Sequence, residues 1–360
     1  MTTNEIGPAD AADRSLIVRT AFGSMAAQTL RAAVQLRVVE LIGDTTRPAD
    51  DIAAEAGADP RSVLRLSRAL AAFGLLREHA PGTFSVTPTG MLLDPRRPGS
   101  LTTFVRVFTD PVATRAWERL DDSVRTGDVA FDAVFGTDFF GHLARHPELS
   151  AAFNSAMSQA TRAVAAVLPS AFDFGRFTSV TDVGGGDGTL LAAVLTAHPG
   201  LTGAVFDTAE GLAGAPATLE RHGLTERCSP HPGDFFAPGS LPKGSDLYLI
   251  KSVLHNWPDE QAVTILRHCR EALPPGGGRI LIVEPVLPDV VGAGPGDNAP
   301  DTGITYLSDL NMLVNVGGRE RTRADFEDLC RRAALSVTSV TPLAGAAPFS
   351  LVEAAPGAAA

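Results

Sequence analysis

The chain has 360 residues, of which 44% are hydrophobic and 20% charged, and its formal net charge is −11. This composition is typical of a globular protein, and the acidic balance argues against a surface that binds nucleic acid through Lys and Arg. The three cysteines are widely spaced, so neither a disulfide framework nor a zinc site is predicted. The sequence begins without an apolar leader and contains no run of about 18 apolar residues. We therefore expect a cytoplasmic protein that binds neither nucleic acid nor a membrane.

The first hundred residues combine helical patterns with a short hairpin. Apolar residues recur at helical spacing over residues 16–42, and two further helices are expected over 48–53 and 63–70. Apolar and polar residues then alternate on either side of Pro81 and Gly82, which predicts a short β-hairpin. This order is typical of a winged helix-turn-helix, which serves either DNA binding or subunit packing. Acidic side chains are interspersed with the arginines of this unit, which favours subunit packing over DNA binding.

Residues 101–170 have a helical pattern throughout and contain many of the phenylalanines. Aromatic residues at helical spacing predict either a core or the roof of an apolar substrate pocket. We therefore divide the chain into a winged-helix dimerisation domain (1–100), a helical linker and substrate-pocket segment (101–170) and a catalytic domain (171–360).

The last part of the chain alternates short apolar runs with helical stretches. Strands are expected at Val180–Val183, Thr202–Phe206, Leu247–Ile250 and Arg279–Val283. Such alternation predicts an α/β fold, a doubly wound Rossmann-like parallel sheet with helices on both faces. The Gly- and Pro-rich residues 292–303 are expected to form a loop, and the tail from Ala354 is expected to be frayed.

A glycine-rich segment, Asp182 to Gly188, follows the first of these strands. Glycines there allow the backbone to approach a ligand at the start of a helix. A dinucleotide fingerprint needs a third glycine further on, where Thr189 and Leu190 stand, so the segment does not match that fingerprint. Asp207 closes the next strand, where it either accepts hydrogen bonds from ribose hydroxyls or caps the next helix.

Three further side chains are predicted at the carboxyl ends of strands. Lys251 and His255 follow the strand expected at Leu247–Ile250, and Glu284 ends the strand that begins at Arg279. A single histidine there is often structural, but a carboxylate on the same edge can hold an imidazole in one tautomer, which favours an acid–base role. Asp234 ends a further presumed strand, which lies between Asp207 and Leu247, and with Phe235 it forms either an adenosine site or a plain turn.

Together these residues carry a family resemblance. Five motifs occur in order: Asp182–Gly188, Gly233–Phe236, Lys251 with Leu254–Trp257, Glu284–Pro285 and Gly317–Thr322. Over about residues 16–352 the chain resembles the small-molecule O-methyltransferases that depend on S-adenosylmethionine, typified by plant caffeic acid O-methyltransferases and bacterial antibiotic-biosynthesis enzymes. The resemblance implies that the winged-helix domain forms a homodimer.

The resemblance also implies roles for individual residues. His255 matches the family's catalytic base, and Glu284 and Glu320 match the carboxylates that orient it. The implied cofactor contacts are Asp182, Gly184, Gly186, Asp207, Asp234, Phe235 and Lys251. The implied substrate contacts are Phe153, Met157, Met312 and Asn315.

Two positions depart from the family pattern. Thr208 and Ala209 follow Asp207 where Leu-Pro is usual, and Gln159 stands where plant members tend to carry a histidine. The expected activity is methylation of an aromatic hydroxyl of a bacterial secondary metabolite. We expect this reaction to be metal-independent, because the sequence shows no cluster of Asp and Asn ligands for magnesium. Two alternatives stay open: a hydroxylase or decarboxylase of a polyketide on the same scaffold, and a winged-helix regulator that senses a ligand.

Overall fold

The computed structural model describes residues 8–292 and 302–357, and the chain divides into two compact units that meet between Pro111 and Val112. Residues 101–111 of the predicted middle segment, with helix α6 (Thr102–Phe108), belong to the first unit, whereas residues 112–170 belong to the second. None of the described helices is both long and apolar enough to span a membrane.

The first unit has the predicted winged-helix order. Its other elements are α1 (Pro8–Ala21), α2 (Gly23–Gln35), α3 (Val38–Ile42), β1 (Thr46–Pro48), α4 (Ala49–Ala56), α5 (Pro60–Ala72), β2 (Leu76–Ala80), β3 (Thr83–Val86) and the 3₁₀ turn η1 (Gly90–Leu93). Asp59 caps α5 by accepting a hydrogen bond from the Ser62 amide at 2.8 Å. Strand β1 pairs with β3 and was not predicted, because three residues are too few to show an alternating pattern.

The second unit is built on a sheet of eight described strands. They are β4 (Ser179–Val183), β5 (Thr202–Asp207), β6 (Cys228–Pro232), β7 (Leu247–Lys251), β8 (Arg279–Leu287), β9 (Arg321–Thr322), β10 (Leu335–Pro342) and β11 (Phe349–Pro356). Their order is β10-β11-β8-β7-β4-β5-β6, with β9 paired to β8. Strands β4 to β8 pair in parallel, and β11 is antiparallel to β8. The chain order reverses between β4 and β7, which is where open α/β sheets bind ligands.

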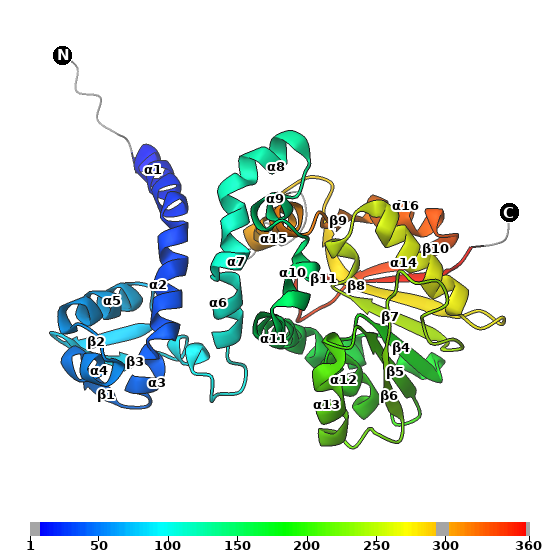
Figure 1. Ribbon diagram of the computed structural model, residues 1–360, viewed down its shortest axis with the longest axis horizontal. Coiled ribbons are helices and arrows are strands. Elements are labelled where there is room, and N and C mark those ends of the chain that lie inside the picture. The colour runs from blue at the N-terminus through cyan, green and yellow to red at the C-terminus, as the bar shows by residue number, and fades with distance from the viewer. Residues whose placement is uncertain (1–7, 293–301, 358–360) are drawn as a thin grey trace, which may run out of the picture. The chain divides into compact units, whose positions relative to one another are not determined.

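Helices cover both faces of this sheet (Figure 1). Helices α11 (Pro147–Ala171), α12 (Thr189–Ala197) and α13 (Ala215–Arg221) share one core, and α14 (Asp259–Ala272) and α16 (Arg323–Arg332) share the other. The strands alternate accordingly: Leu247 and Leu249 of β7 pack in the first core, while Tyr248 and Ile250 pack in the second. The predicted doubly wound fold is confirmed.

A helical layer lies beyond the sheet in the second unit. It contains α7 (Pro111–Thr114), the 3₁₀ turn η2 (Arg115–Arg119), α8 (Leu120–Thr126), α9 (Ala130–Phe135), α10 (Phe139–Arg145) and α15 (Thr302–Asn315). Phe131 of α9 is fully buried and packs in one cluster with Val314 of α15, although the two are far apart in the sequence. The aromatic residues of this segment therefore form a core, and α15 joins the helices that precede the sheet.

Two sequence expectations are wrong in detail. Strand β8 does not end at Glu284 but continues to Leu287, because β11 and β9 both pair with it. The tail is not frayed from Ala354, because Ala355 and Pro356 of β11 pair with β10. The predicted loop over 292–303 falls mostly outside the described residues, and its last residue, Gly303, lies in α15.

Candidate active site

The carboxyl edge of the sheet gathers the predicted residues from separate parts of the chain. The glycine-rich segment follows β4, Asp207 ends β5 and Lys251 ends β7. His255 lies on the 3₁₀ turn η5 (Leu254–Asn256), just after β7, and Glu284 lies in the neighbouring strand β8. The parallel register places these side chains on one edge, as the sequence predicts.

The glycine-rich loop has a backbone that only glycine adopts easily. Gly184, Gly186 and Gly188 have φ angles of +73°, +55° and +75°. A Cβ at Gly184 would lie 2.5 Å from Cγ2 of Val253, whereas a Cβ at Gly186 would meet no atom within 4 Å. Gly184 is thus required by packing, while Gly186 leaves open space above the loop where a ligand can approach.

Asp207 links this loop to the neighbouring strand. Its Oδ2 accepts a hydrogen bond from the Gly186 amide at 2.9 Å, and its Oδ1 accepts one from the Thr208 amide at 2.7 Å. Burial raises the pKa of Asp207 despite these bonds. Each carboxylate oxygen keeps a further acceptor position, which suits the paired hydroxyls of a ribose. The amide of Gly211 at the next helical turn is capped by Thr208 Oγ1 at 3.1 Å.

Two charged side chains lie buried beside the loop. Asp182 is 2% exposed and its Oδ2 has no hydrogen-bond partner among the described residues. Burial, with Asp207 nearby, raises the pKa of Asp182 to about 7. Lys251 donates to Thr161 Oγ1 of α11 at 3.1 Å, and burial lowers its pKa. Buried groups of both signs suit a polar, zwitterionic ligand, since unpaired polar atoms are costly to bury.

The predicted adenosine residues lie in the loop after β6. Asp234 is exposed and comes two residues after the end of that strand, and its Oδ1 accepts a hydrogen bond from the Phe236 amide at 2.8 Å. The Phe235 ring is half-buried and packs edge-on against Phe236 and Trp257, with centroid distances of 4.9 and 6.0 Å.

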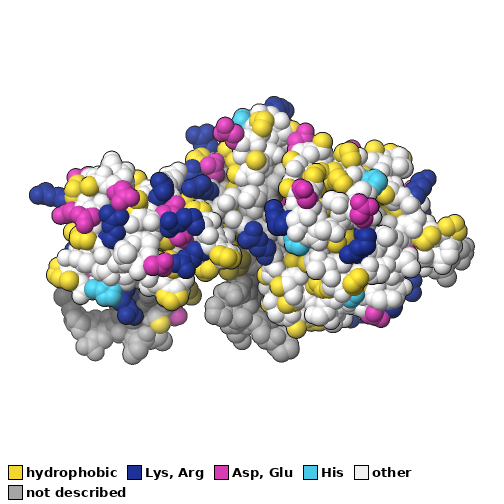
Figure 2. Space-filling model, turned by 90° about the horizontal axis from the view of Figure 1, so that it is seen from below, with side chains coloured by type: hydrophobic (Ala, Val, Ile, Leu, Met, Phe, Trp, Pro, Cys, Tyr) yellow, Lys and Arg dark blue, Asp and Glu magenta, His cyan; other side chains and the backbone are white. Residues whose placement is uncertain are grey.

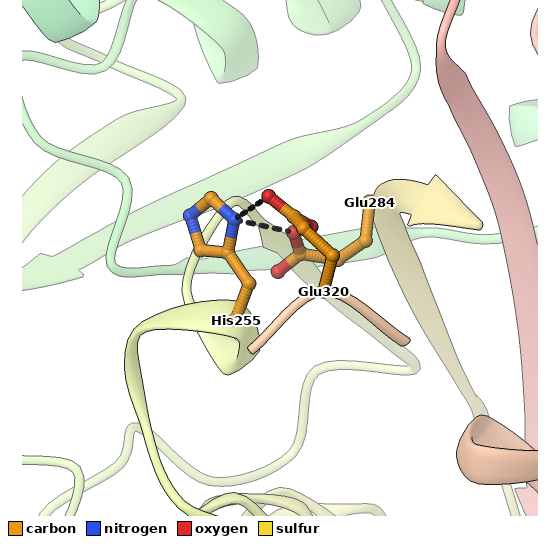
Figure 3. Close-up of side chains that lie close together, drawn as sticks. All are labelled: His255, Glu284 and Glu320. Atoms are coloured by element: carbon orange, nitrogen blue, oxygen red, sulfur yellow. Dashed lines mark hydrogen bonds and ion pairs between the residues drawn. The ribbon is translucent and has the colours of Figure 1, made fainter. Parts of the chain in front are cut away.

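One ring nitrogen of His255 faces two buried carboxylates. Its Nδ1 is 3.0 Å from Oε1 of Glu320 and 3.6 Å from Oε2 of Glu284, as the dashed lines in Figure 3 show. A carboxylate can only accept, so Nδ1 carries the proton of this hydrogen bond. The other ring nitrogen, Nε2, points away from both carboxylates (Figure 3). In the neutral ring its lone pair is therefore free to take a proton.

Charges act on one another within the triad formed by His255, Glu284 and Glu320. Burial lowers the pKa of His255, but Glu284 and Glu320 together raise it further, so that it lies above its ordinary value. Burial raises the pKa of Glu284, and His255 offsets this only in part. Each of the three residues offers one possible metal-ligating atom, and these atoms lie within 4.8 Å of one another. Among the described residues, this is the one group of three or more His, Cys, Asp or Glu side chains that could hold a metal ion. The triad therefore offers either a hydrogen-bonded base or three ligands for a metal.

Further groups hold Glu284 and Glu320 in place, and sequence reasoning missed the two side chains among them. Oε1 of Glu320 also accepts from Ser308 Oγ at 2.9 Å, and the Glu320 amide donates to Asp309 Oδ1 at 2.8 Å. Oε1 of Glu284 accepts from the Val253 and Leu254 amides at 2.9 and 3.0 Å. Ser308 and Asp309 belong to no motif, so only the approach of α15 to the triad reveals them.

The predicted substrate residues lie on two helices. Phe153 and Met157 are half-buried on α11, and the Phe153 ring is 5.3 Å edge-on from that of Phe139, which packs on the cluster containing Val314 of α15. Met312 and Asn315 are buried on α15. Asn315 donates to Asn311 Oδ1 at 2.8 Å, whereas its own Oδ1 has no partner among the described residues.

Two family models match the chain. Residues 117–336 match the family described as the O-methyltransferase domain, and residues 18–94 match the O-methyltransferase dimerisation domain. O-demethylpuromycin-O-methyltransferase of Streptomyces alboniger is 45% identical over 342 residues, which cover 94% of this chain and 88% of that one. Aclacinomycin 10-hydroxylase of Streptomyces purpurascens is 33% identical over 334 residues, which cover 91% of this chain and 86% of that one.

A solved structure gives the cofactor. An O-methyltransferase from neocarzinostatin biosynthesis, in complex with S-adenosylmethionine and a hydroxynaphthoic acid, superimposes with a TM-score of 0.74 and 33% identity, over 91% of this chain and 95% of that one. The open space at Gly186 and the unpartnered Asp182 oxygen fit such a ligand. The chain belongs to the O-methyltransferase family and is an enzyme that depends on S-adenosylmethionine.

Proposed function

We propose that this enzyme methylates an aromatic hydroxyl group of a bacterial secondary metabolite and that His255 is the general base. The observation that carries the proposal is the hydrogen bond from Nδ1 of His255 to the buried Glu320, which leaves Nε2 free. Two of the relatives named above support the acceptor class: one is named for O-demethylpuromycin, and the other binds a hydroxynaphthoic acid. A base at this position has no clear use in a protein that only senses a ligand.

The base is needed because a phenol is a weak nucleophile. Its pKa is about 10, so it is protonated at neutral pH. Neutral His255 accepts the hydroxyl proton at Nε2 while Glu284 and Glu320 stabilise the imidazolium that forms. When bound, S-adenosylmethionine supplies a methyl group on a positively charged sulfur, which becomes a neutral sulfide once the oxygen has taken the methyl group. We infer that Phe153, Met157 and Met312 exclude water from this attack.

The same proposal assigns the cofactor contacts. Asp207 accepts hydrogen bonds from the ribose hydroxyls, and the loop of Gly184 and Gly186 carries the nucleoside next to β4. Asp182 and Lys251 lie beside the polar chain of the cofactor, while Asp234 and Phe235 contact its adenosine end. Asn315 offers a polar contact to the acceptor, because its Oδ1 is buried without a described partner. No metal is required in this scheme.

The Glu320→Gln variant tests the base directly. Ionised Glu320 raises the pKa of His255, and His255 accepts a proton only when neutral, so kcat/KM falls as the pH drops through that pKa. In E320Q this acidic limb is expected to move to lower pH, and the plateau to fall at least about tenfold, because a neutral amide stabilises the imidazolium less and can donate to Nδ1 as well as accept from it. Glu327→Gln, on the exposed face of α16, is the matched control. An unchanged limb in E320Q contradicts the assignment.

We infer that the winged-helix unit pairs two subunits and binds no nucleic acid. Its basic side chains are interspersed with acidic ones on the face shown in Figure 2, and Arg47 and Arg68 form ion pairs with Glu55 and Glu78. Its first two helices expose large apolar side chains, Leu16, Ile17, Val18, Phe22 and Met25, which are 54–69% exposed. Such a stripe is typical of an interface between subunits.

Charge in this stripe is expected to separate the dimer. Ile17 is 69% exposed and Phe22 is 56% exposed, so aspartate at both positions costs the fold little but places charge in the interface. Sedimentation velocity is expected to give a dimer for the wild type and a monomer for I17D/F22D. Val124→Asp, equally exposed in the second unit, controls for added charge and is expected to remain dimeric. A double variant that sediments as the wild-type dimer contradicts the proposed interface.

The cysteines support a location in the cytoplasm. Cys228, Cys269 and Cys330 are all buried and free. Unpaired thiols are normal in a reducing compartment, which is where we propose that the enzyme works.

A further inference from the structure

The base is carried by a short and strained piece of backbone. His255 lies in the three-residue turn η5, which begins shortly after Ser252, a non-glycine residue with a φ angle of +54°. Such a turn has few hydrogen bonds of its own, and a left-handed residue persists only where its surroundings hold it. Since the hydrogen bond to Glu320 orients the imidazole ring but not the backbone, the position of Nε2 depends on what fixes the turn.

Arg321 makes the contacts that fix it. Its side chain is fully buried, and it donates from Nη1 to the Leu254 carbonyl and from Nη2 to the Trp257 carbonyl, both at 2.8 Å. These two carbonyls flank His255 on either side. Nε and Nη2 also bond Oδ1 of Asp259 at 3.2 and 2.8 Å. The planar guanidinium therefore joins both ends of the turn to the first residue of α14, and Asp259 balances its buried charge.

The backbone of the same segment packs directly on the turn. A Cβ at Gly318 would lie 2.0 Å from the His255 carbonyl oxygen, so only glycine allows this approach. Glu320, two residues further on, bonds the imidazole ring, and Arg321 bonds the backbone of the turn. Gly318, Glu320 and Arg321 thus hold both the ring and the backbone of His255.

We infer that Arg321 is a positioning residue for methyl transfer, which acts by holding the turn that carries His255. None of its described hydrogen bonds reaches the glycine-rich loop or the predicted substrate residues, so we expect its effect on the reaction to pass through the base. The inference rests on the proposed role of His255. Lysine at this position keeps a positive charge beside Asp259, but it has no planar fork that reaches two carbonyls and a carboxylate together.

The first test compares Arg321→Lys with Arg319→Lys, using O-demethylpuromycin as the acceptor. Arg319 also bonds Asp259, at 3.0 Å, but none of its described hydrogen bonds reaches η5. R321K is expected to lower kcat about 10- to 100-fold through misplacement of the base, with the affinity for S-adenosylmethionine within about twofold of wild type. R319K is expected to keep its kcat. An R321K enzyme with wild-type kcat overturns the inference.

A double-mutant cycle with His255→Gln separates positioning from general damage. If Arg321 acts only through the base, R321K lowers the residual rate of H255Q by less than about twofold. A loss in the H255Q background equal to that in the wild type overturns the inference. A wild-type rate in the H255Q single variant shows instead that the proposed base is wrong, so the two failures are distinct.

Two further arms keep the test decisive. Proton NMR of the Nδ1–H of His255 needs no acceptor: the signal of the bond to Glu320 is expected in the wild type and R319K and is expected to be lost in R321K. Its persistence in R321K counts against the inference. If R321K does not fold, Asp259→Asn replaces it, because Asp259 accepts two hydrogen bonds that align the guanidinium of Arg321. D259N is then expected to lower kcat in the wild-type background and not in the H255Q background. A D259N enzyme with wild-type kcat overturns the inference.

Discussion

Glutamine in place of His255 is expected to lower kcat at least about a hundredfold, because the variant removes the group that we propose takes the hydroxyl proton. The affinity for S-adenosylmethionine is expected to stay at the wild-type value, since the described hydrogen bonds of the imidazole go to Glu320 and not to the glycine-rich loop. Steady-state kinetics with calorimetric titration of the cofactor separate the two quantities. Parallel losses in both identify a structural histidine instead.

His198→Ala is the matched control for this variant. His198 is another partly buried imidazole of the second unit, and its Nε2 is 2.9 Å from the Pro169 carbonyl oxygen. It follows the end of α12, so it lies at the edge of the sheet opposite to the glycine-rich loop. Its replacement is expected to reduce thermal stability slightly and to leave kcat unchanged. A similar loss of kcat in both variants argues against a special role for His255.

Alanine in place of Gly186 is expected to weaken the binding of S-adenosylmethionine at least about tenfold, which corresponds to about 1.4 kcal/mol. The added Cβ meets no protein atom within 4 Å, so it fills only the space above the loop that the ligand needs. The φ angle of +55° adds a cost of about 1–2 kcal/mol to folding. Calorimetric titration measures the first effect and thermal unfolding the second.

Gly223→Ala separates backbone strain from ligand exclusion. Gly223 has a φ angle of +65° and, like Gly186, no atom within 4 Å of its missing Cβ, but it follows α13 on the way into β6. It is expected to lose similar stability and to keep its cofactor affinity. If G186A binds the cofactor as tightly as G223A does, the ligand does not approach the loop at Gly186.

The sequence predicts those parts of the site that depend on a local pattern. The run from Asp182 to Gly188 requires left-handed backbone, and glycine is the residue that supplies it. Apolar runs followed by Asp207 and Lys251 indicate strand ends, and parallel strands bring such ends to one edge. His255 and Glu284 therefore lie together as predicted, on neighbouring segments.

The remaining features depend on contacts between distant segments. Strand β8 extends beyond Glu284 because β11 and β9 pair with it, and neither β10 nor β11 was predicted. Ser308 reaches Glu320 only because α15 packs beside the triad. The role of Arg321 becomes visible only from the distances between its guanidinium and the Leu254 and Trp257 carbonyls. A single sequence contains no record of such pairings.

The most direct test of this account is the transfer of a deuterated methyl group by the wild-type enzyme in the presence of EDTA. Purified protein is incubated with CD₃-labelled S-adenosylmethionine and with O-demethylpuromycin or a hydroxynaphthoic acid, and the products are weighed by mass spectrometry. We predict one CD₃ group on the acceptor oxygen for each demethylated cofactor formed, at a rate that added Mg²⁺ does not change. A product that carries a new hydroxyl group instead of CD₃, or a rate that EDTA abolishes and Mg²⁺ restores, contradicts a metal-free methyl transfer to oxygen.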